Sequence, residues 1–342
     1  ISIFSDIDLN FDGSLNYQDC IDSVATIGTE AQVFPAGCTV SNDYEQTRDS
    51  AAIYFDSSYD LTDAVTLRFG ARYTHDSGDL EGFRALLLGS DGVQLANLIP
   101  GSADVPGPST RRSYSDGKVT GKLGLDYTTD AGNLLYLSLS QGYRSSAFNG
   151  QAFFDSSELT VVKPETLIAA EGGFKLDLLD QRLRLNGAVF WYGYEDQQFL
   201  NVDASTAVQQ LVNVPKSNIY GGELESVYRV SDRLRFNGSL ALLQSEIDEG
   251  TLSGVNLAGN SLPLAPEYSL TVGMNWDVVS FSYGDLEFQV DGSYVDSQYF
   301  DVFGDKVTQQ NGYALGNARL ALKPGEPGLE VALWVKNFTD EN

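Results

Sequence analysis

Apolar and polar residues alternate one by one along many stretches of this chain. Between residues 65 and 74 every second side chain is apolar, while Arg68 and Arg72 occupy the positions between. A period of two residues is that of a β-strand with one apolar and one polar face. Similar alternation recurs in residues 118–127, 182–191, 234–243 and 286–294. The pattern predicts an all-β protein built from antiparallel strands.

About twelve strands are expected between residue 51 and the C-terminus. Each apolar set has about five members, so each strand runs for about ten residues, enough to cross a bilayer core at a tilt of about 45°. The predicted strands are residues 51–59, 64–75, 116–128, 133–146, 164–178, 182–198, 217–230, 233–248, 266–279, 285–299, 310–323 and 328–338.

Short turns and long loops alternate between these strands. This arrangement is typical of a transmembrane β-barrel, which has tight turns on one side and large loops on the other. A large soluble β-sandwich is the alternative, since its strands alternate too. Charges on the polar face, such as Arg182 and Asp291, and aromatic residues near strand ends, such as Trp191 and Trp334, favour a barrel with a watery lumen.

Composition narrows the class further. The 342 residues include 34 Gly, 18 Tyr and 18 Phe, which suits tight turns and aromatic girdles. The net charge of −26 argues against a nucleic-acid partner, whose phosphates need a basic surface. The carboxylates either keep exposed loops soluble or bind divalent cations. No run of about 18 apolar residues predicts a transmembrane helix.

The first 50 residues are expected to form an extracellular loop with its own chemistry, ahead of barrel strands in residues 51–342. Residues 8–19 fit the EF-hand pattern D-x-[DN]-x-[DN]-G, closed by an acidic residue, and resemble a dockerin-type calcium loop. An acidic glycine turn without metal is the alternative. The predicted calcium ligands are Asp8, Asn10, Asp12, Ser14, Asn16 and Asp19.

Two cysteines, Cys20 and Cys38, lie in the same N-terminal segment. A disulfide between them would fit an oxidising compartment such as the periplasm or cell surface, and two free thiols are the alternative. No signal peptide opens the chain, and both ends look like cuts within a longer barrel. Because an open sheet edge is not tolerated in lipid, we expect further strands outside this sequence.

Five short motifs resemble those of the TonB-dependent outer-membrane receptor family, and they occur in the family's order between about residues 51 and 340. They are Tyr136–Ser145 with Phe148–Gly150, Lys163–Leu167 with Glu171–Lys175, Asn218–Glu225, Leu262–Glu267, and Leu333–Asp340. The family's N-terminal plug with its TonB box, and its last strand, are absent from this sequence.

The resemblance implies a barrel of about 22 strands, of which these would be about strands 10 to 21. It also implies a receptor in the bacterial outer membrane that takes up a scarce solute, most commonly a ferric siderophore. A TonB-type complex would supply energy through the missing plug. A passive porin, or a calcium-braced structural surface protein, is the alternative. An outer-membrane enzyme is a third, but no catalytic set is visible, so we expect no enzyme.

The long loops, about residues 76–115, 147–163, 199–216, 249–263 and 300–309, are the expected substrate-facing surface. They carry aromatic residues that are expected to be exposed, Phe83 and Phe303 among them. Such rings could stack on an aromatic chelator, a sugar or a corrin, or could pack loop against loop. His75, the only histidine, is expected at a strand end. The candidate substrate-binding residues are Phe148, Phe153, Phe154 and Phe199.

Overall fold

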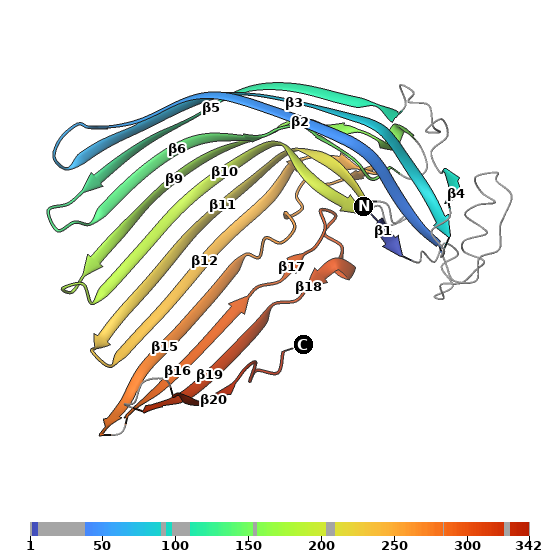
Figure 1. The fold of residues 1–342 in the computed structure, drawn as a ribbon. Coiled ribbons are helices and arrows are strands. Elements are labelled where there is room, and N and C mark those ends of the chain that lie inside the picture. Colours follow the sequence, from blue (N-terminus) through green and yellow to red (C-terminus); the bar gives the residue numbers. More distant parts are fainter. Residues whose placement is uncertain are drawn as a thin grey trace.

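A computed structural model describes residues 2–5, 38–89, 94–97, 110–152, 156–202, 209–282, 284–324 and 329–341. One large, curved antiparallel sheet dominates this part of the chain (Figure 1). None of the helices in the described ranges is long and apolar enough to cross a membrane. The predicted calcium motif, residues 8–19, lies outside the described residues.

Twelve main strands follow one another through the sheet, and each pairs with the next in the chain. This up-and-down order confirms the predicted antiparallel barrel wall. Two short strands, β1 (Ser2–Ser5) and β4 (Gln94–Asn97), extend the sheet beside β2 and β3. The main strands are β2 (Cys38–Asp60), β3 (Val65–Gly89), β5 (Arg112–Thr128), β6 (Leu134–Arg144), β9 (Glu165–Leu178), β10 (Leu183–Val202), β11 (Gln209–Ser231), β12 (Leu234–Glu249), β15 (Tyr268–Phe281), β16 (Gly284–Val295), β19 (Tyr313–Pro324) and β20 (Val331–Val335).

The tight turns lie together at one end of the sheet, at the left of Figure 1. Between β5 and β6 the turn needs Gly132, whose φ of 81° suits a residue without Cβ. Between β9 and β10 the turn uses Leu179, Asp180 and Gln181 with φ of 55°, 56° and 64°. Three consecutive non-glycine residues in this region make a strained turn, held in place by the two strands it joins.

Four strands are longer than the alternation predicted. β2 begins at Cys38 instead of near residue 51, and β3 continues to Gly89 instead of ending near residue 75. β10 likewise continues to Val202 instead of ending near residue 198, and β11 begins at Gln209 instead of near residue 217. The expected loops at 76–115 and 199–216 are therefore shorter. The reason is that the apolar alternation marks the lipid-facing part of a strand, whereas the backbone ladder continues beyond it where the lipid-facing side chains are no longer apolar.

His75 is consequently not at a strand end. It lies within β3, paired with Ala51 of β2 and Gly117 of β5. Its neighbours in the ladder continue past it for many residues, so the expectation of a loop beside it is wrong. Its side chain is on the same face as Tyr73 and is exposed.

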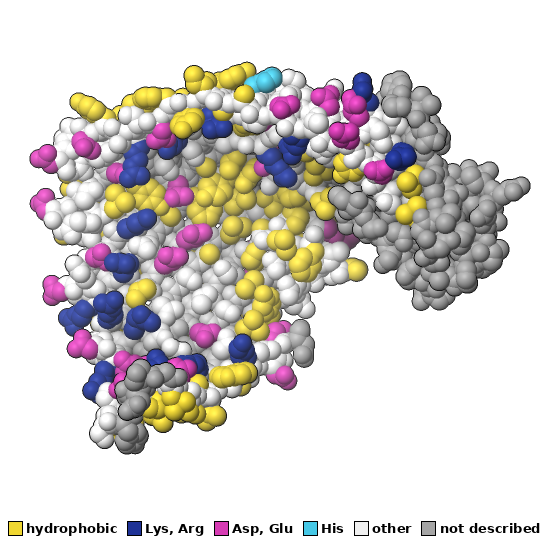
Figure 2. All heavy atoms as spheres, in the orientation of Figure 1, with side chains coloured by type: hydrophobic (Ala, Val, Ile, Leu, Met, Phe, Trp, Pro, Cys, Tyr) yellow, Lys and Arg dark blue, Asp and Glu magenta, His cyan; other side chains and the backbone are white. Residues whose placement is uncertain are grey.

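The sheet has two faces of different chemistry. On the lipid face, large apolar side chains stand exposed: Leu137 is 65 %, Val189 67 % and Leu333 75 % exposed. Such exposure suits a surface covered by acyl chains. The lumen face carries charged and hydroxyl residues, including Arg72 and Lys122. Many of the charged side chains gather near the short turns, with hydrophobic side chains farther from them (Figure 2).

Small elements build the opposite end of the sheet, which we call the rim. Nearly all of the buried apolar residues in the described ranges lie here, and Ala321 in β19 is the exception. The wall therefore relies on its backbone ladder, while the rim has a side-chain core. The rim elements are β7 (Ala147–Phe148), η2 (Ser156–Glu158), β8 (Val161–Val162), β13 (Thr251–Leu252), β14 (Val255–Asn256), β17 (Gln298–Tyr299), η3 (Lys306–Thr308) and β18 (Gln309–Gln310).

Candidate functional site at the rim and the lumen face

Ion pairs cross neighbouring strands of the lumen face. Arg68 of β3 pairs with Asp126 of β5. Lys122 of β5 reaches over the intervening strand β3 to Asp56 of β2, with Nζ 2.6 Å from Oδ2. The strand between them carries Gly70 at this point, and a Cβ there would lie 3.0 Å from the Asp56 oxygen and 3.2 Å from the Lys122 Cε. Glycine therefore opens the path for a pair that spans three strands.

A polar hollow of about 360 Å³ lies beside this pair. We call it the Gly70 hollow. Its lumen-face lining includes Arg72 of β3 and Lys122 of β5, with hydroxyl groups from Thr120 and Ser140. Arg72 is held in place, because its Nε donates to Thr74 Oγ1 at 2.9 Å and its guanidinium lies 5.8 Å from the centre of the Tyr54 ring. The hollow thus combines basic groups and neutral hydroxyls with the Asp56 carboxylate, which pairs with Lys122.

Aromatic rings line the lumen face farther along the sheet. Phe190 and Tyr192 of β10 stack with centroids 4.7 Å apart, and Phe190 covers Gly221 of the next strand. Tyr136 of β6 lies over Gly173 of β9 and donates its hydroxyl hydrogen to Glu171 Oε1 at 2.6 Å. Because each glycine lacks a side chain, each ring can lie flat on the neighbouring backbone. In this part of the wall, aromatic rings cover the glycines of the neighbouring strands.

The described parts of the first rim loop, residues 145–152 and 156–163, fold against β2 and β5. Arg48 Nε donates to Tyr114 Oη at 3.0 Å, and its Nη2 donates to Ser145 Oγ at 3.1 Å. Arg112 Nε and Nη2 donate to carbonyl oxygens of Leu159 at 2.5 Å and Ser156 at 2.8 Å. Two strand arginines therefore fix the start and the end of this loop.

Asn149 organises the same loop from within and is only 2 % exposed. Its Nδ2 donates to the Glu158 carbonyl at 2.8 Å, and its Oδ1 accepts from the Leu211 backbone N–H at 3.3 Å. The second bond ties the loop to β11. The loop is thus tied both to β5 and to β11, strands on either side of the β6–β9 pair that it connects.

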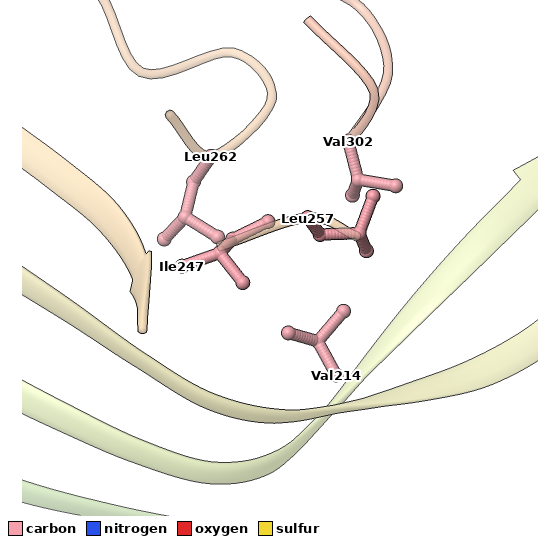
Figure 3. Close-up of a cluster of buried hydrophobic side chains, with 5 residues drawn as sticks. All are labelled: Val214, Ile247, Leu257, Leu262 and Val302. Carbon is pink, nitrogen blue, oxygen red and sulfur yellow. The ribbon is translucent and has the colours of Figure 1, made fainter. Parts of the chain in front are cut away.

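The second rim assembly joins the β12–β15 loop to the β16–β19 loop, residues 247–265 with 296–310. Its core contains Val214, Ile247, Leu257, Leu262 and Val302, whose side chains converge in Figure 3.

Polar clamps flank this core. Asn260 Nδ2 donates to the carbonyls of Val302 and Phe303, each at 3.0 Å. Asp301 Oδ1 accepts from the backbone N–H groups of Phe303 and Gly304, at 2.9 and 3.1 Å. The bonds from Asn260 join residues 42 and 43 positions apart, so the two loops form one unit.

The candidate aromatic residues occupy the rim with different surroundings. Phe148 is 8 % exposed and packs against Tyr114 of β5, with ring centroids 5.1 Å apart and ring planes tilted by 49°. Phe199 is half-buried against the core of the second rim assembly. Phe153 and Phe154 lie outside the described residues. Ligand contact by these four rings stays a prediction. In the described structure, Phe148 and Phe199 pack against other residues of the protein.

Two other aromatic residues expected to be exposed are not. Phe83 is 1 % exposed and stacks on Tyr44 at 5.5 Å, because the β3 extension carries its own small core. Phe303 is half-buried and packs against the second rim assembly. Cys20 and the side chain of Cys38 lie outside what the structure describes, so the disulfide stays a prediction.

Sequence reasoning missed the residues that hold the rim together, Asn149, Asn260 and Asp301. A signal was present in two of them. Asn149 stands in the Phe148–Gly150 part of a family-like motif, and Asn260 lies two residues before the motif at Leu262–Glu267. Buried asparagine amides commonly bind loop backbone groups, so a lone Asn beside a loop motif is a usable indication.

An apolar hollow of about 640 Å³ opens on the other face of the sheet. Its floor contains Gly172, Gly187 and Gly222, and Leu137 and Val189 are among its walls. All five residues are on the lipid face, so acyl chains are its natural contents. It is not a candidate for a polar cargo.

In the ranges that the structure covers, no group of three or more His, Cys, Asp or Glu could hold a metal ion. What the described part of the chain offers is a polar lumen wall, a smooth aromatic wall and two ordered rim units. Such surfaces can hold and pass a solute.

Comparison with known proteins agrees with this geometry. The family model described as "TonB dependent receptor-like, beta-barrel" matches residues 3–338. The pesticin receptor of Yersinia pestis is 25 % identical over 296 residues, which cover 86 % of this chain and 39 % of that receptor.

Solved structures show the same fold. The ferric yersiniabactin uptake receptor FyuA from Yersinia pestis matches with a TM-score of 0.69 and 22 % identity, over 90 % of this chain and 43 % of that one. The siderophore receptor PiuA from Acinetobacter baumannii matches with a TM-score of 0.65 and 19 % identity, over 87 % and 40 %.

The chain thus spans about two fifths of the length of the proteins it matches. The family match nevertheless extends over nearly all of it, from β1 past β20. The twelve paired strands, the exposed apolar face and the charged lumen face are those of such a barrel. The chain belongs to the TonB-dependent receptor β-barrel family of the bacterial outer membrane.

Proposed function

We propose that this chain is part of a receptor that imports a ferric siderophore across the outer membrane, energised by a TonB-type complex through a plug in the lumen. The observation that carries the proposal is the family match over residues 3–338. The names of similar proteins support the cargo: a pesticin receptor, a ferric yersiniabactin uptake receptor and a siderophore receptor.

The described surfaces are compatible with this role. Both rim units are ordered by buried cores and polar clamps, and ordered loops lose less conformational entropy when a ligand binds. Below the rim, hydroxyl, charged and aromatic side chains replace the exposed aliphatic residues of the lipid face. A solute leaving the rim meets groups able to replace part of its hydration shell.

Uptake of radioactive iron tests the proposal. Iron-starved cells carrying the receptor should take up iron-55 from at least one ferric siderophore in a panel, and cells without the receptor should not. Collapsing the proton gradient or removing TonB should abolish uptake while leaving surface binding intact. Uptake that continues without TonB would indicate a passive porin. A receptor that neither binds nor transports any ferric chelate would overturn the cargo.

Calcium is a separate part of the proposal. We infer that Asp8, Asn10, Asp12, Ser14, Asn16 and Asp19 bind one calcium ion that braces the N-terminal loop, and that a Cys20–Cys38 disulfide closes the segment that follows. The support is the ligand spacing with Gly13 at the turn position.

Calorimetric titration of the chelator-treated receptor tests this inference. One calcium should bind with a Kd between about 10⁻⁶ and 10⁻³ M, within the range of such loops. The double variant Asp8→Asn with Asp12→Asn should lose the binding. Asp180→Asn, in a tight turn far along the chain, is the matched control. Binding that survives the double variant would place calcium elsewhere.

A further inference from the structure

A column of basic side chains follows the lumen face at one side of the sheet, although acidic residues outnumber basic ones by 47 to 21 in the chain. The strand register places these side chains on the same face of four adjacent strands, β2, β3, β5 and β6. The column consists of Arg48, Arg68, Arg72, Lys118, Lys122 and Arg144.

The members of the column nearest the tight turns form ion pairs within the wall, and the members nearer the rim form none in the described residues. Arg68 and Lys122 form the ion pairs with Asp126 and Asp56. In the described residues, Arg48, Arg72, Lys118 and Arg144 form no ion pair with a carboxylate. Arg48 and Arg72 instead donate to neutral hydroxyl groups.

Three carboxylates lie in the same region of the face, and one of them, Glu165 of β9, stands opposite Arg144 in the β6–β9 ladder. Asp76 and Asp116 stand opposite each other in the β3–β5 ladder, one pair above Thr74 and Lys118. Asp116 Oδ2 is engaged by the Ser146 backbone N–H at 2.8 Å. Four cations without an ion pair against three carboxylates leave this part of the wall with one surplus positive charge, in a chain whose overall charge is −26. The surplus positive charge requires an anion from outside the described residues, or water.

Within the column, the Gly70 hollow is the place where such an anion could bind. Arg72 carries the charge that no carboxylate neutralises, and Tyr54 and Thr74 fix the direction of its guanidinium. A fixed guanidinium presents a planar pair of N–H donors to a carboxylate or phenolate oxygen pair. A volume of about 360 Å³ suits one edge of a chelate.

We propose that the Gly70 hollow is an anion-binding subsite that selects negatively charged ferric chelates, with Arg72 as its principal donor. Thr120, Lys122 and Ser140 complete the subsite. Lys118, Arg144 and Arg48 continue the positive surface toward the rim, where they would steer an anion along this wall. The inference rests on the proposed function and narrows it to chelates with ionised carboxylate, phenolate or catecholate groups.

The test compares chelates of different charge in energy-depleted cells that carry the receptor. The panel contains ferric citrate and a ferric catecholate as anions, ferrichrome as a neutral chelate and ferrioxamine B as a cation. Wild type should bind an anionic chelate most tightly. Arg72→Gln should weaken that binding about tenfold, which corresponds to about 1.4 kcal/mol. Arg72→Lys should recover part of it, since the charge returns without the planar fork.

Arg184→Gln is the matched control, because Arg184 is also on the lumen face but pairs with Asp177 near a tight turn. It should leave anion binding unchanged. Surface abundance and heat-modified migration of each variant show that the barrel has folded. Raising the salt concentration should reduce wild-type binding of the anion and have little effect on Arg72→Gln.

Three outcomes would overturn the inference. Wild type could bind only neutral or cationic chelates, which would leave ferric uptake standing and remove the anion subsite. Arg72→Gln could leave anion binding unchanged, or weaken all chelates equally. Arg72→Gln could instead expose a lumen segment to added protease without changing chelate selectivity, which would show that the arginine pairs with a carboxylate of the protein. Failure to bind every chelate would refute the proposed function itself.

Discussion

The transmembrane wall and the second rim assembly hold together in opposite ways. In the wall, β9, β10 and β11 are joined by unbroken backbone ladders, and side chains such as Val189 stand 67 % exposed on the lipid face. In the second rim assembly the small strands are only two residues long, and the core is formed by side chains such as Ile247 at the end of β12, which is fully buried, and Leu257, which is 1 % exposed. The wall is stabilised mainly by backbone hydrogen bonds between strands, and the rim mainly by the packing of buried side chains.

This difference decides where a substitution matters. Truncating a lipid-facing side chain removes contacts that lipid can replace, whereas truncating a rim core residue leaves a cavity between two loops. The wall is sensitive where a side chain would be added, because glycines admit the rings of neighbouring strands. The same protein should therefore show two distinct patterns of mutational tolerance.

The largest effect is expected from Ile247→Ala. Removing this side chain from the core shared by Val214, Leu257 and Val302 should destabilise the rim by about 2–5 kcal/mol, the usual range for such truncations. Hydrogen exchange should accelerate in residues 250–265 and 300–308 and stay slow in β9 and β10. Val189→Ala is the matched control, with little change expected anywhere. Equal acceleration in both variants would break the contrast between wall and rim.

A smaller effect is expected from adding one methyl group to the lumen face. In Gly173→Ala the new Cβ would lie 2.6 Å from the Tyr136 ring and 2.6 Å from the Gly187 carbonyl oxygen. Displacing a ring and a backbone group should cost about 1–3 kcal/mol in the free energy of unfolding. Gly142→Ala is the control, since nothing lies within 4 Å of a Cβ there. Urea unfolding in lipid vesicles measures both, and a similar cost for the two would show that steric overlap is not the cause.

The wall could be predicted from the sequence because its chemistry is local. Each lipid-crossing segment repeats an apolar residue every second position, and that period alone gave the twelve strands and their turns. The extensions of β2 and β3 carry no such period. Ser77 and Asp79 occupy the side of β3 that carries Tyr73, so the apolar set on that side ends, yet the ladder to β5 continues through Leu80. Backbone hydrogen bonds do not depend on side-chain polarity.

The rim could not be predicted because its contacts join distant segments. Phe148 was expected to be exposed, since loop residues usually are. It is buried because its loop folds back onto Tyr114, a contact that no local pattern announces. The lumen glycines pose a related difficulty. Which residue faces Gly173 depends on the register between β6 and β9, and a shift of one position would turn Tyr136 away from it.

The smallest effect is expected where a charge pair of the wall stands near its tight turns. Lys323 Nζ lies 2.6 Å from both carboxylate oxygens of Glu287, yet the lysine side chain is 45 % exposed. Exposed pairs are screened by water and salt, so the coupling between these residues should be only about 0.2–1 kcal/mol. A double-mutant cycle with Lys323→Gln and Glu287→Gln measures this coupling by urea unfolding, and 1 M salt should reduce it further.

A coupling above about 2 kcal/mol that did not change with salt would mean that the lumen face excludes water at this end, since only desolvated pairs couple so strongly. The charged part of the wall would then resemble the rim, and the contrast between backbone and side-chain stabilisation would hold only for the lipid face.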